Sequence, residues 1–173
     1  MWGRPTIFLI KKMQNEIITE RLSLNLLTID DFDFVKRLVN TEGWIAFIGD
    51  RYVHTNDDAI AYVTKILNTE NLFYWVVRTR DNNTPVGIIS FMKRNYLENF
   101  DIGFAFLPEY NGSGYAYEAA KEVLSMVSKT PGYYPVVATT VPQNAKSIKL
   151  LTKLGLHFEK EIEVEDEILQ VYS

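Results

Sequence analysis

Apolar and polar positions along the chain follow two different periods, which separates predicted strands from predicted helices. An apolar residue at every second position, or a short apolar run between turn residues, is typical of a strand, whereas apolar residues three and four apart are typical of a helix. On this basis we predict strands at residues 21–27, 73–78, 86–92, 100–107, 134–140, 156–163 and 167–172. Helices are predicted after Thr28, after Thr55, from Ala116 and after Asn144.

The predicted helices carry recognisable start signals and one apolar face each. Two of them begin with a capping box, a hydroxyl residue followed three positions later by an acidic one: Thr28 with Asp31, and Thr55 with Asp58. Asn144 is a good N-cap for the last helix, and Gly155 lies where a C-cap residue belongs. The residues that we expect to face the core are Phe32, Val35, Leu38 and Val39 in the first helix, Ile60, Val63, Ile66 and Leu67 in the second, and Ile148, Leu151 and Leu154 in the last.

The connections between the strands predict the fold class. Turn residues 81–83 and 165–166 each join two strands closely, which indicates antiparallel hairpins. The strands at 100–107 and 134–140 are instead separated by a helix, so they form a right-handed parallel unit. The sequence therefore predicts a mixed α/β fold, with a predominantly antiparallel sheet around a central parallel strand–helix–strand unit.

Size and charge limit the domain organisation and the partners. The 173 residues, 47% of them apolar, provide one compact domain, which we expect at residues 16–173 after an N-terminal extension at residues 1–15. The 18 basic and 22 acidic residues give a formal charge of −4. This balance argues against nucleic acid or an anionic membrane as partner, and it favours a cationic acceptor such as an amine.

Cysteine and histidine usage limits the chemistry. The chain has no cysteine, which excludes disulfides, thiolate metal sites and an acyl-cysteine intermediate. His54 and His157 are the two histidines, and no carboxylates stand at a spacing that would complete a zinc site with them, so we expect no metal. The apolar run at residues 7–10 is too short for the core of a signal peptide, so we expect a cytoplasmic protein.

The candidate chemistry lies in the bend that follows the strand at 100–107. Asn111-Gly112-Ser113-Gly114 contains two glycines, which can adopt positive φ and turn successive N–H groups toward one point. The helix from Ala116 would place these groups at its positive end, where a diphosphate fits. The alternative is a plain connection, because Asn-Gly is also a common turn dipeptide. Gly103 in the preceding strand would allow another backbone or a ligand to approach closely.

The segment Asn111-Gly112-Ser113-Gly114-Tyr115-Ala116 resembles the acetyl-CoA-binding motif of the GCN5-related N-acetyltransferase (GNAT) superfamily, Gln/Arg-x-x-Gly-x-Gly/Ala, from which Asn111 departs at the first position. The likeness extends over nearly the whole chain from Ile18 and is greatest with the branch of ribosomal-protein acetyltransferases. It implies the GNAT fold, with acetyl-CoA as acyl donor. The residues that it implies for cofactor binding are Phe104, Ala105 and Phe106 along the pantetheine arm, Asn111, Gly112, Ser113, Gly114, Tyr115, Ala116 and Tyr117 around the diphosphate, and Asn144 and Ser147 near the thioester.

Transfer to an amine requires a base and an acid. A free amine is protonated near neutral pH, and only its neutral form attacks a thioester. The resemblance points to Asp101 as the base, with Glu98 as a competitor, although Asp101 is equally explained as a solvated charge at the end of a strand.

The sequence does not assign the general acid to a single residue. Many members of the superfamily use a tyrosine at the position of Leu151, so that role is vacant here. Asn144 and Ser147 match the Asn-x-x-Ser pattern of the ribosomal-type branch, in which the serine lies near the cofactor sulfur; a simple N-cap explains both residues as well. Tyr96, Tyr110 and Tyr115 remain alternative acids.

The segment at residues 42–52 is the candidate acceptor site. Trp44, Phe47 and Tyr52 could form its walls, and Asp50 or Arg51 could fix a charged end of the acceptor. The alternative is that each aromatic residue only fills the core beneath a loop. The resemblance favours the acceptor site, because this region lines it in the superfamily.

These observations together predict an acetyl-CoA-dependent N-acetyltransferase that transfers the acetyl group directly to a primary amine of a small molecule or of a peptide or protein N-terminus. We expect a monomer or a homodimer. Two alternatives remain: a catalytically silent acyl-CoA-binding module, and an interaction domain in which the bend after Tyr110 binds no ligand.

Overall fold

The computed structural model describes residues 13–173, and most of the predicted N-terminal extension lies outside them. The described residues form one eight-stranded sheet in the order β1-β2-β3-β4-β5-β6-β8-β7. The strands are β1 (Glu16–Ile18), β2 (Leu22–Leu26), β3 (Leu72–Thr79), β4 (Pro85–Lys93), β5 (Phe100–Phe106), β6 (Val136–Thr140), β7 (Phe158–Val164) and β8 (Glu167–Tyr172). The helices are α1 (Phe32–Val39), α2 (Glu42–Phe47), α3 (Asn56–Leu67), α4 (Tyr115–Ser128) and α5 (Ala145–Lys153), with 3₁₀ turns η1 (Ile29–Asp31) and η2 (Pro108–Tyr110).

The sheet is antiparallel except at one pair of strands near its centre. β5 and β6 run parallel and are connected through α4, but they pair only at Phe100 with Val136 and at Asp101 with Val137. Beyond Asp101 the two strands diverge, while β5 stays paired with β4 as far as Phe106. The predicted mixed α/β fold with its central strand–helix–strand unit is confirmed, and the divergence opens the sheet in the middle.

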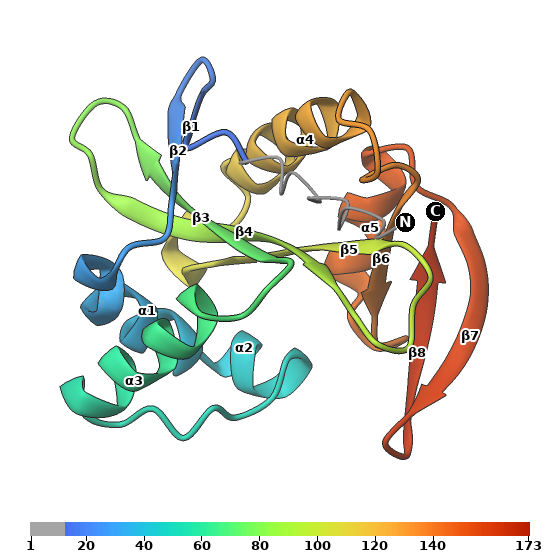
Figure 1. Cartoon of the computed structure of the whole chain (residues 1–173), viewed down its shortest axis with the longest axis horizontal. Helices are drawn as coiled ribbons and strands as arrows, with labels where there is room; N and C mark the ends of the chain where they lie inside the picture. The colour runs from blue at the N-terminus through green and yellow to red at the C-terminus, as the bar shows by residue number, and fades with distance from the viewer. Residues whose placement is uncertain (1–12) are drawn as a thin grey trace, which may run out of the picture.

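Helices cover both faces of the sheet (Figure 1). Because side chains alternate along a strand, Ile102 of β5 packs in a core with α4 and α5, whereas Ala105 packs against the core beneath α1, α2 and α3. Both faces are therefore buried, as the apolar strand sequences require. The divergence of β5 and β6 lies between the two groups of helices.

The helix starts agree with the sequence, but only part of the predicted core face of α3 does: Val63 and Ile66 are buried as expected. Both capping boxes form, as predicted. Ile60 and Leu67 were expected to face the core, yet they are 38% and 48% exposed. The residues of α3 that are buried are Ala59, Val63 and Ile66. This expectation was wrong because only a narrow stripe of α3 packs against the core that it shares with α1, and Ile60 and Leu67 flank this stripe at the solvent edge.

Residues 13–15 of the predicted extension contact the sheet. Met13 is buried in the core with Trp75, and the Trp75 indole N–H donates a hydrogen bond to the carbonyl of Gln14 over 3.1 Å. The N–H of Leu26 donates to the carbonyl of Asn15 over 3.0 Å. The rest of the predicted extension, residues 1–12, lies outside the described residues.

Candidate active site

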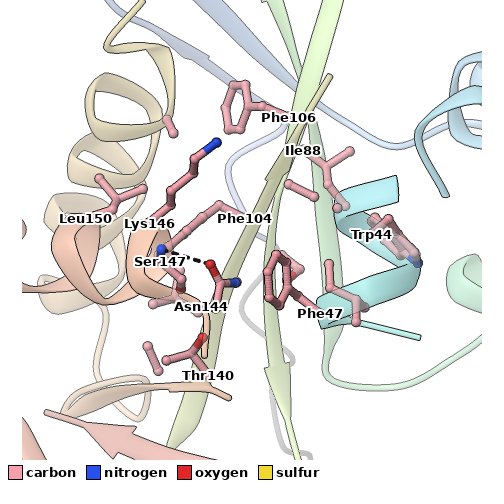
Figure 2. A pocket seen from close by; sticks show the side chains of 18 of the residues that line it. Trp44, Phe47, Ile88, Phe104, Phe106, Thr140, Asn144, Lys146, Ser147 and Leu150 are labelled. Atoms are coloured by element: carbon pink, nitrogen blue, oxygen red, sulfur yellow. Dashed lines mark hydrogen bonds between the residues drawn. The ribbon is translucent and has the colours of Figure 1, made fainter. Parts of the chain in front are cut away.

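A large cleft opens where β5 and β6 diverge, with a cavity volume of about 1370 Å³. Figure 2 shows side chains of α5 on one side of it and side chains of α2 on the other. The labelled residues of α5 and its N-cap are Asn144, Lys146, Ser147 and Leu150, and those of α2 are Trp44 and Phe47; Phe104 and Phe106 of β5 lie between the two groups. The cleft therefore reaches from the start of α4 and α5 to the helices on the opposite face of the sheet.

The bend at the mouth of the cleft presents open backbone donors. Gly112 and Gly114 adopt φ values of +81° and +79°, and Gly114 is the N-cap of α4 without any side-chain cap. Within residues 13–173, the N–H groups of Gly112, Gly114, Tyr115, Ala116 and Tyr117 donate no hydrogen bond. These donors and the positive end of the α4 dipole together favour an anion.

A network of side chains stabilises this bend on the side opposite to its exposed amides. Arg21 donates from Nη1 to the carbonyl of Ser113 over 2.9 Å and pairs with the Glu118 carboxylate over 2.7 Å. The same carboxylate accepts from the Thr19 hydroxyl over 2.6 Å, and the Arg21 guanidinium lies 4.7 Å from the centre of the Tyr115 ring. Because the Ser113 carbonyl is turned toward Arg21, the neighbouring amides remain exposed on the opposite side.

We expect Glu118→Gln to weaken the fold in a pH-dependent way. Burial alone would raise the pKa of Glu118, but the hydrogen bonds from Thr19 and Arg21 and the Arg21 charge outweigh it, so the pKa lies below its usual 4.5. A lowered carboxyl pKa stabilises the fold above the unfolded-state value, and this contribution is lost as the pH falls. The variant should therefore lose about 1–3 kcal/mol of unfolding free energy near pH 7.

Urea unfolding at two pH values tests this expectation. The difference between wild type and variant should shrink when the pH is lowered to about 3.5, because the unfolded chain takes up a proton at this carboxyl below its ordinary pKa of 4.5 and the contribution to stability is progressively lost. Glu122→Gln is the control, because Glu122 is an exposed acidic residue on the same helix. An equal difference at both pH values would show that the carboxylate charge at Glu118 contributes nothing.

The start of α5 supplies polar groups to the other side of the cleft. The Asn144 side-chain oxygen accepts the N–H of Ser147 over 3.1 Å, which confirms Asn144 as the N-cap, and both residues line the cleft. Leu151 also lines the cleft and is buried, so no phenol stands at that position. Three lysines of α5 add positive charge to the lining: Lys146, Lys149 and Lys153.

Asp101 is buried at the point where β5 and β6 diverge, with 2% of its surface exposed, and its side chain does not line the cleft. Its carboxylate accepts hydrogen bonds from Arg94 Nε and from the backbone N–H of Thr139 on β6, the latter over 3.1 Å. Burial raises the pKa of Asp101, and the Arg94 charge opposes this only in part. The carboxylate thus joins β5 to β6 beyond their last backbone pair, Asp101 with Val137, and both of its oxygens accept hydrogen bonds from protein donors.

Some of the remaining predicted site residues line the cleft, and others lie outside its lining. The cleft lining includes Trp44, Phe47 and Arg51, together with Phe104, Ala105 and Phe106 of β5. It does not include Tyr52, whose side chain is 74% exposed, nor Glu98 or Ser113. Trp44 is also buried in the core beneath α1–α3, so the core interpretation and the cleft interpretation of this residue both hold.

The structure adds lining residues that the sequence did not single out. Arg94, in the polar connection after β4, Tyr74 of β3 and Glu167 of β8 all line the cleft. They come from three elements that only the sheet order brings together, so no local motif marks them. Gly103, predicted to permit close approach, lies opposite Ser90, and a Cβ atom at Gly103 would stand only 2.6 Å from the Ser90 hydroxyl oxygen.

Among residues 13–173, no group of three or more His, Cys, Asp and Glu side chains is arranged to hold a metal ion. In the same part of the chain no helix combines the length and apolarity needed to cross a membrane.

A mixed sheet that opens between two parallel strands, with an uncapped helix N-terminus at the opening, defines an acyltransferase fold. The family model described as "Acetyltransferase (GNAT) domain" matches residues 21–157. The chain belongs to this GNAT acetyltransferase family, and the predicted enzyme class, N-acetyltransferase, is confirmed.

Relatives and solved structures agree with this assignment. The chain is 30% identical over 143 residues to a Bacillus subtilis (strain 168) protein named as the uncharacterized N-acetyltransferase YnaD, with 83% of each chain covered. A GNAT acetyltransferase from Bacillus anthracis superposes with a TM-score of 0.75 at 27% identity, covering 91% of this chain and 95% of that one. Spermidine N-acetyltransferase from Vibrio cholerae, solved with CoA and spermine, has the same fold, with a TM-score of 0.74, 16% identity and coverages of 89% and 95%.

Proposed function

We propose that the protein is an acetyl-CoA-dependent N-acetyltransferase of the ribosomal-type branch, which transfers the acetyl group directly to a primary amine of a small molecule or of a peptide N-terminus. The observation that carries the proposal is the set of unpartnered N–H groups between Gly112 and Tyr117, at the positive end of α4. A diphosphate satisfies these donors and is stabilised by the helix dipole.

The cleft has the shape and charge for the rest of coenzyme A. With the diphosphate at the bend, the pantetheine arm extends along the gap between β5 and β6, beside the backbone of residues 104–106. The departure from Gln or Arg at Asn111 removes one side-chain contact. The lysines of α5 offset it with positive charge on the facing side of the cleft: Lys146, Lys149 and Lys153.

The reaction needs few side chains. The neutral amine attacks the thioester carbonyl carbon, the C–S bond breaks, and the thiolate takes up a proton while the amine loses one. We propose the Ser147 hydroxyl, on the first turn of α5, as the group that meets the thiolate, with Asn144 fixing that turn. Of the carboxylates in the part of the chain that the structure describes, Glu42 and Glu167 line the cleft and are the candidates to accept the amine proton.

Asp101, the base suggested by the resemblance, is better placed as a positioning residue. Its oxygens already accept from Arg94 and Thr139, and its side chain lies beneath the cleft surface. A base must reach the proton that it removes. We therefore propose that Asp101 acts through Arg94 and through the spacing of β5 and β6.

Turnover with acetyl-CoA tests the proposed function. Purified protein incubated with acetyl-CoA and a panel of primary amines and peptides should release thiol in step with acetylated amine. Ser147→Ala should lower kcat about tenfold or more with little change in the affinity for CoA, since general acid catalysis contributes ~10²–10⁴-fold. Binding of CoA without thiol release on any amine would support the catalytically silent module instead, and no binding at all would leave an interaction domain.

A further inference from the structure

The cleft lining contains an arginine, Arg94, that an ion pair holds in place. Arg94 follows β4, lines the cleft and donates from Nε to the buried Asp101 carboxylate, while the Tyr96 ring lies 5.8 Å from its guanidinium carbon. Burial lowers the pKa of Arg94, but the charge and hydrogen bond of Asp101 outweigh it, and the pKa is raised. The bond to Asp101 uses Nε and the side chain is 34% exposed, so the terminal Nη groups, which carry most of the guanidinium donors, can reach a ligand.

A second arginine lies in the same region. Arg51, just after α2, also lines the cleft, and within residues 13–173 its guanidinium forms no ion pair. Tyr62 and Tyr74 line the cleft as well. Burial raises the pKa of Tyr74 first of all, Tyr62 raises it further, and the charges of Arg51 and Arg94 oppose both. Two guanidinium groups and two phenols therefore belong to the lining of one cleft, and both arginine charges act on the Tyr74 phenol.

The charge of the cleft is opposite to that of the whole chain. The formal charge of −4 favoured a cationic acceptor. The described residues that line the cleft nevertheless include six basic side chains, Arg51, Lys65, Arg94, Lys146, Lys149 and Lys153, against the carboxylates Glu42 and Glu167. Three of the six, Arg51, Lys65 and Arg94, stand away from α5 and its lysines, so coenzyme A at the α4 bend does not account for them.

We infer that the acceptor carries an oxyanion, a carboxylate or a phosphate, in addition to its amine, and that Arg94 and Arg51 bind this oxyanion. The inference rests on the proposed function, since it names the class of acceptor for the same cleft. The planar guanidinium fork of Arg94 matches two oxygens at once, and its anchor on Asp101 fixes the fork before the ligand arrives. Trp44 and Phe47 supply apolar walls beside it.

Binding of small charged and neutral probes to the CoA-saturated protein tests the inference. Benzoate and phenyl phosphate carry the oxyanion, benzamide is neutral, and benzylamine and spermidine are cationic. By calorimetry, one of the two anions should bind at least about tenfold more tightly than benzamide, benzylamine or spermidine. The tighter anion identifies a carboxylate or a phosphate. Equal or tighter binding of the neutral or cationic probes, or no anion binding, would overturn the inference.

Two arginine variants test whether Arg51 and Arg94 cause the preference for anions. Arg51→Gln, on an exposed side chain, should weaken the preferred anion about tenfold, and Arg94→Gln should weaken it about 10- to 100-fold. Because Arg94→Gln leaves a buried carboxylate without its ion pair, the double variant Arg94→Gln/Asp101→Asn guards against unfolding. Lys160→Gln on β7 removes the same charge outside the cleft lining and should leave binding unchanged. Unchanged anion affinity in both folded arginine variants would contradict the assignment.

The order of the titrations distinguishes a failure of the proposed function from a failure of oxyanion binding alone. CoA is titrated first, and failure of CoA to bind would overturn the proposed function together with the inference. Normal CoA binding with no preference for anionic probes would overturn only the inference, and the N-acetyltransferase would then act on a neutral or cationic amine.

Discussion

Gly114→Asp should abolish CoA binding, with a loss of affinity of about 100-fold or more. Gly114 has φ +79°, a conformation that a residue with a Cβ adopts only under strain, and an added Cβ would lie 3.3 Å from Arg21 Nη2. The aspartate would also place a negative charge at the open N-terminus of α4, where the diphosphate of CoA is expected. Both effects act at the same point, so calorimetric titration with CoA should show no measurable heat.

A matched control distinguishes the loss of the diphosphate site from the effect of backbone strain alone. Gly132, in the turn before β6, has φ +92° and does not line the cleft. Gly132→Asp therefore adds a comparable backbone strain and the same charge, and it should lower stability while leaving CoA affinity within about twofold. Normal CoA affinity of Gly114→Asp, or an equal loss in both variants, would count against a diphosphate site at the bend.

Asp101→Asn should give the largest loss of stability among substitutions near the cleft. The change leaves Arg94 without its ion pair and weakens the link to Thr139 on β6. Breaking a buried pair costs about 3–5 kcal/mol, and the partial exposure of Arg94 reduces this to about 2–4 kcal/mol. For a chain of this size the melting temperature should fall by roughly 5–15 °C.

The same variant distinguishes a positioning residue from a base. Turnover should fall because Arg94 and β6 move, while CoA affinity stays within about threefold, since the bend at the start of α4 is not touched. The pH–rate profile, measured below the melting transition, should keep the shape that it has in wild type. Loss of its acidic limb in Asp101→Asn would contradict this account and return Asp101 to the role of general base.

Asp31→Asn is the control for the Asp101 variant. Asp31 is also a buried aspartate paired with an arginine, Arg78, but it caps η1 and does not line the cleft. The variant should lose a similar amount of stability with no change in kcat beyond the fraction that is unfolded. A comparable fall in kcat for the folded Asp31→Asn protein would show that turnover reports only on general destabilisation.

The features that the sequence predicted are those that short segments determine. Capping boxes at Thr28 and Thr55, the N-cap at Asn144 and the glycine bend at 112–114 each depend on residues within a few positions of one another, and all appear in the structure. The parallel unit followed from one long helix between two apolar strands. The recognisable motif and the fold therefore came from local chemistry and from the order of elements.

The features that the sequence could not provide depend on the packing of distant segments. The ion pair of Arg94 with Asp101 and the bond from Thr139 require the register of β4, β5 and β6, which no local pattern encodes. The exposure of Ile60 depends on which stripe of α3 packs against the core that it shares with α1. The net charge of the chain likewise did not predict the positive charge of the cleft, because it averages over a surface on which basic side chains are concentrated in one place.

The most direct test of the account is a titration of the ¹⁵N-labelled protein with CoA, followed residue by residue in ¹H–¹⁵N spectra. The amide protons of Gly112, Gly114, Tyr115, Ala116 and Tyr117 have no acceptor within the described part of the chain. They should shift downfield together as CoA binds and become protected from exchange, because each donates to a phosphate oxygen. CoA binding that leaves these five amides unshifted and unprotected would contradict the diphosphate site on which the proposed mechanism depends.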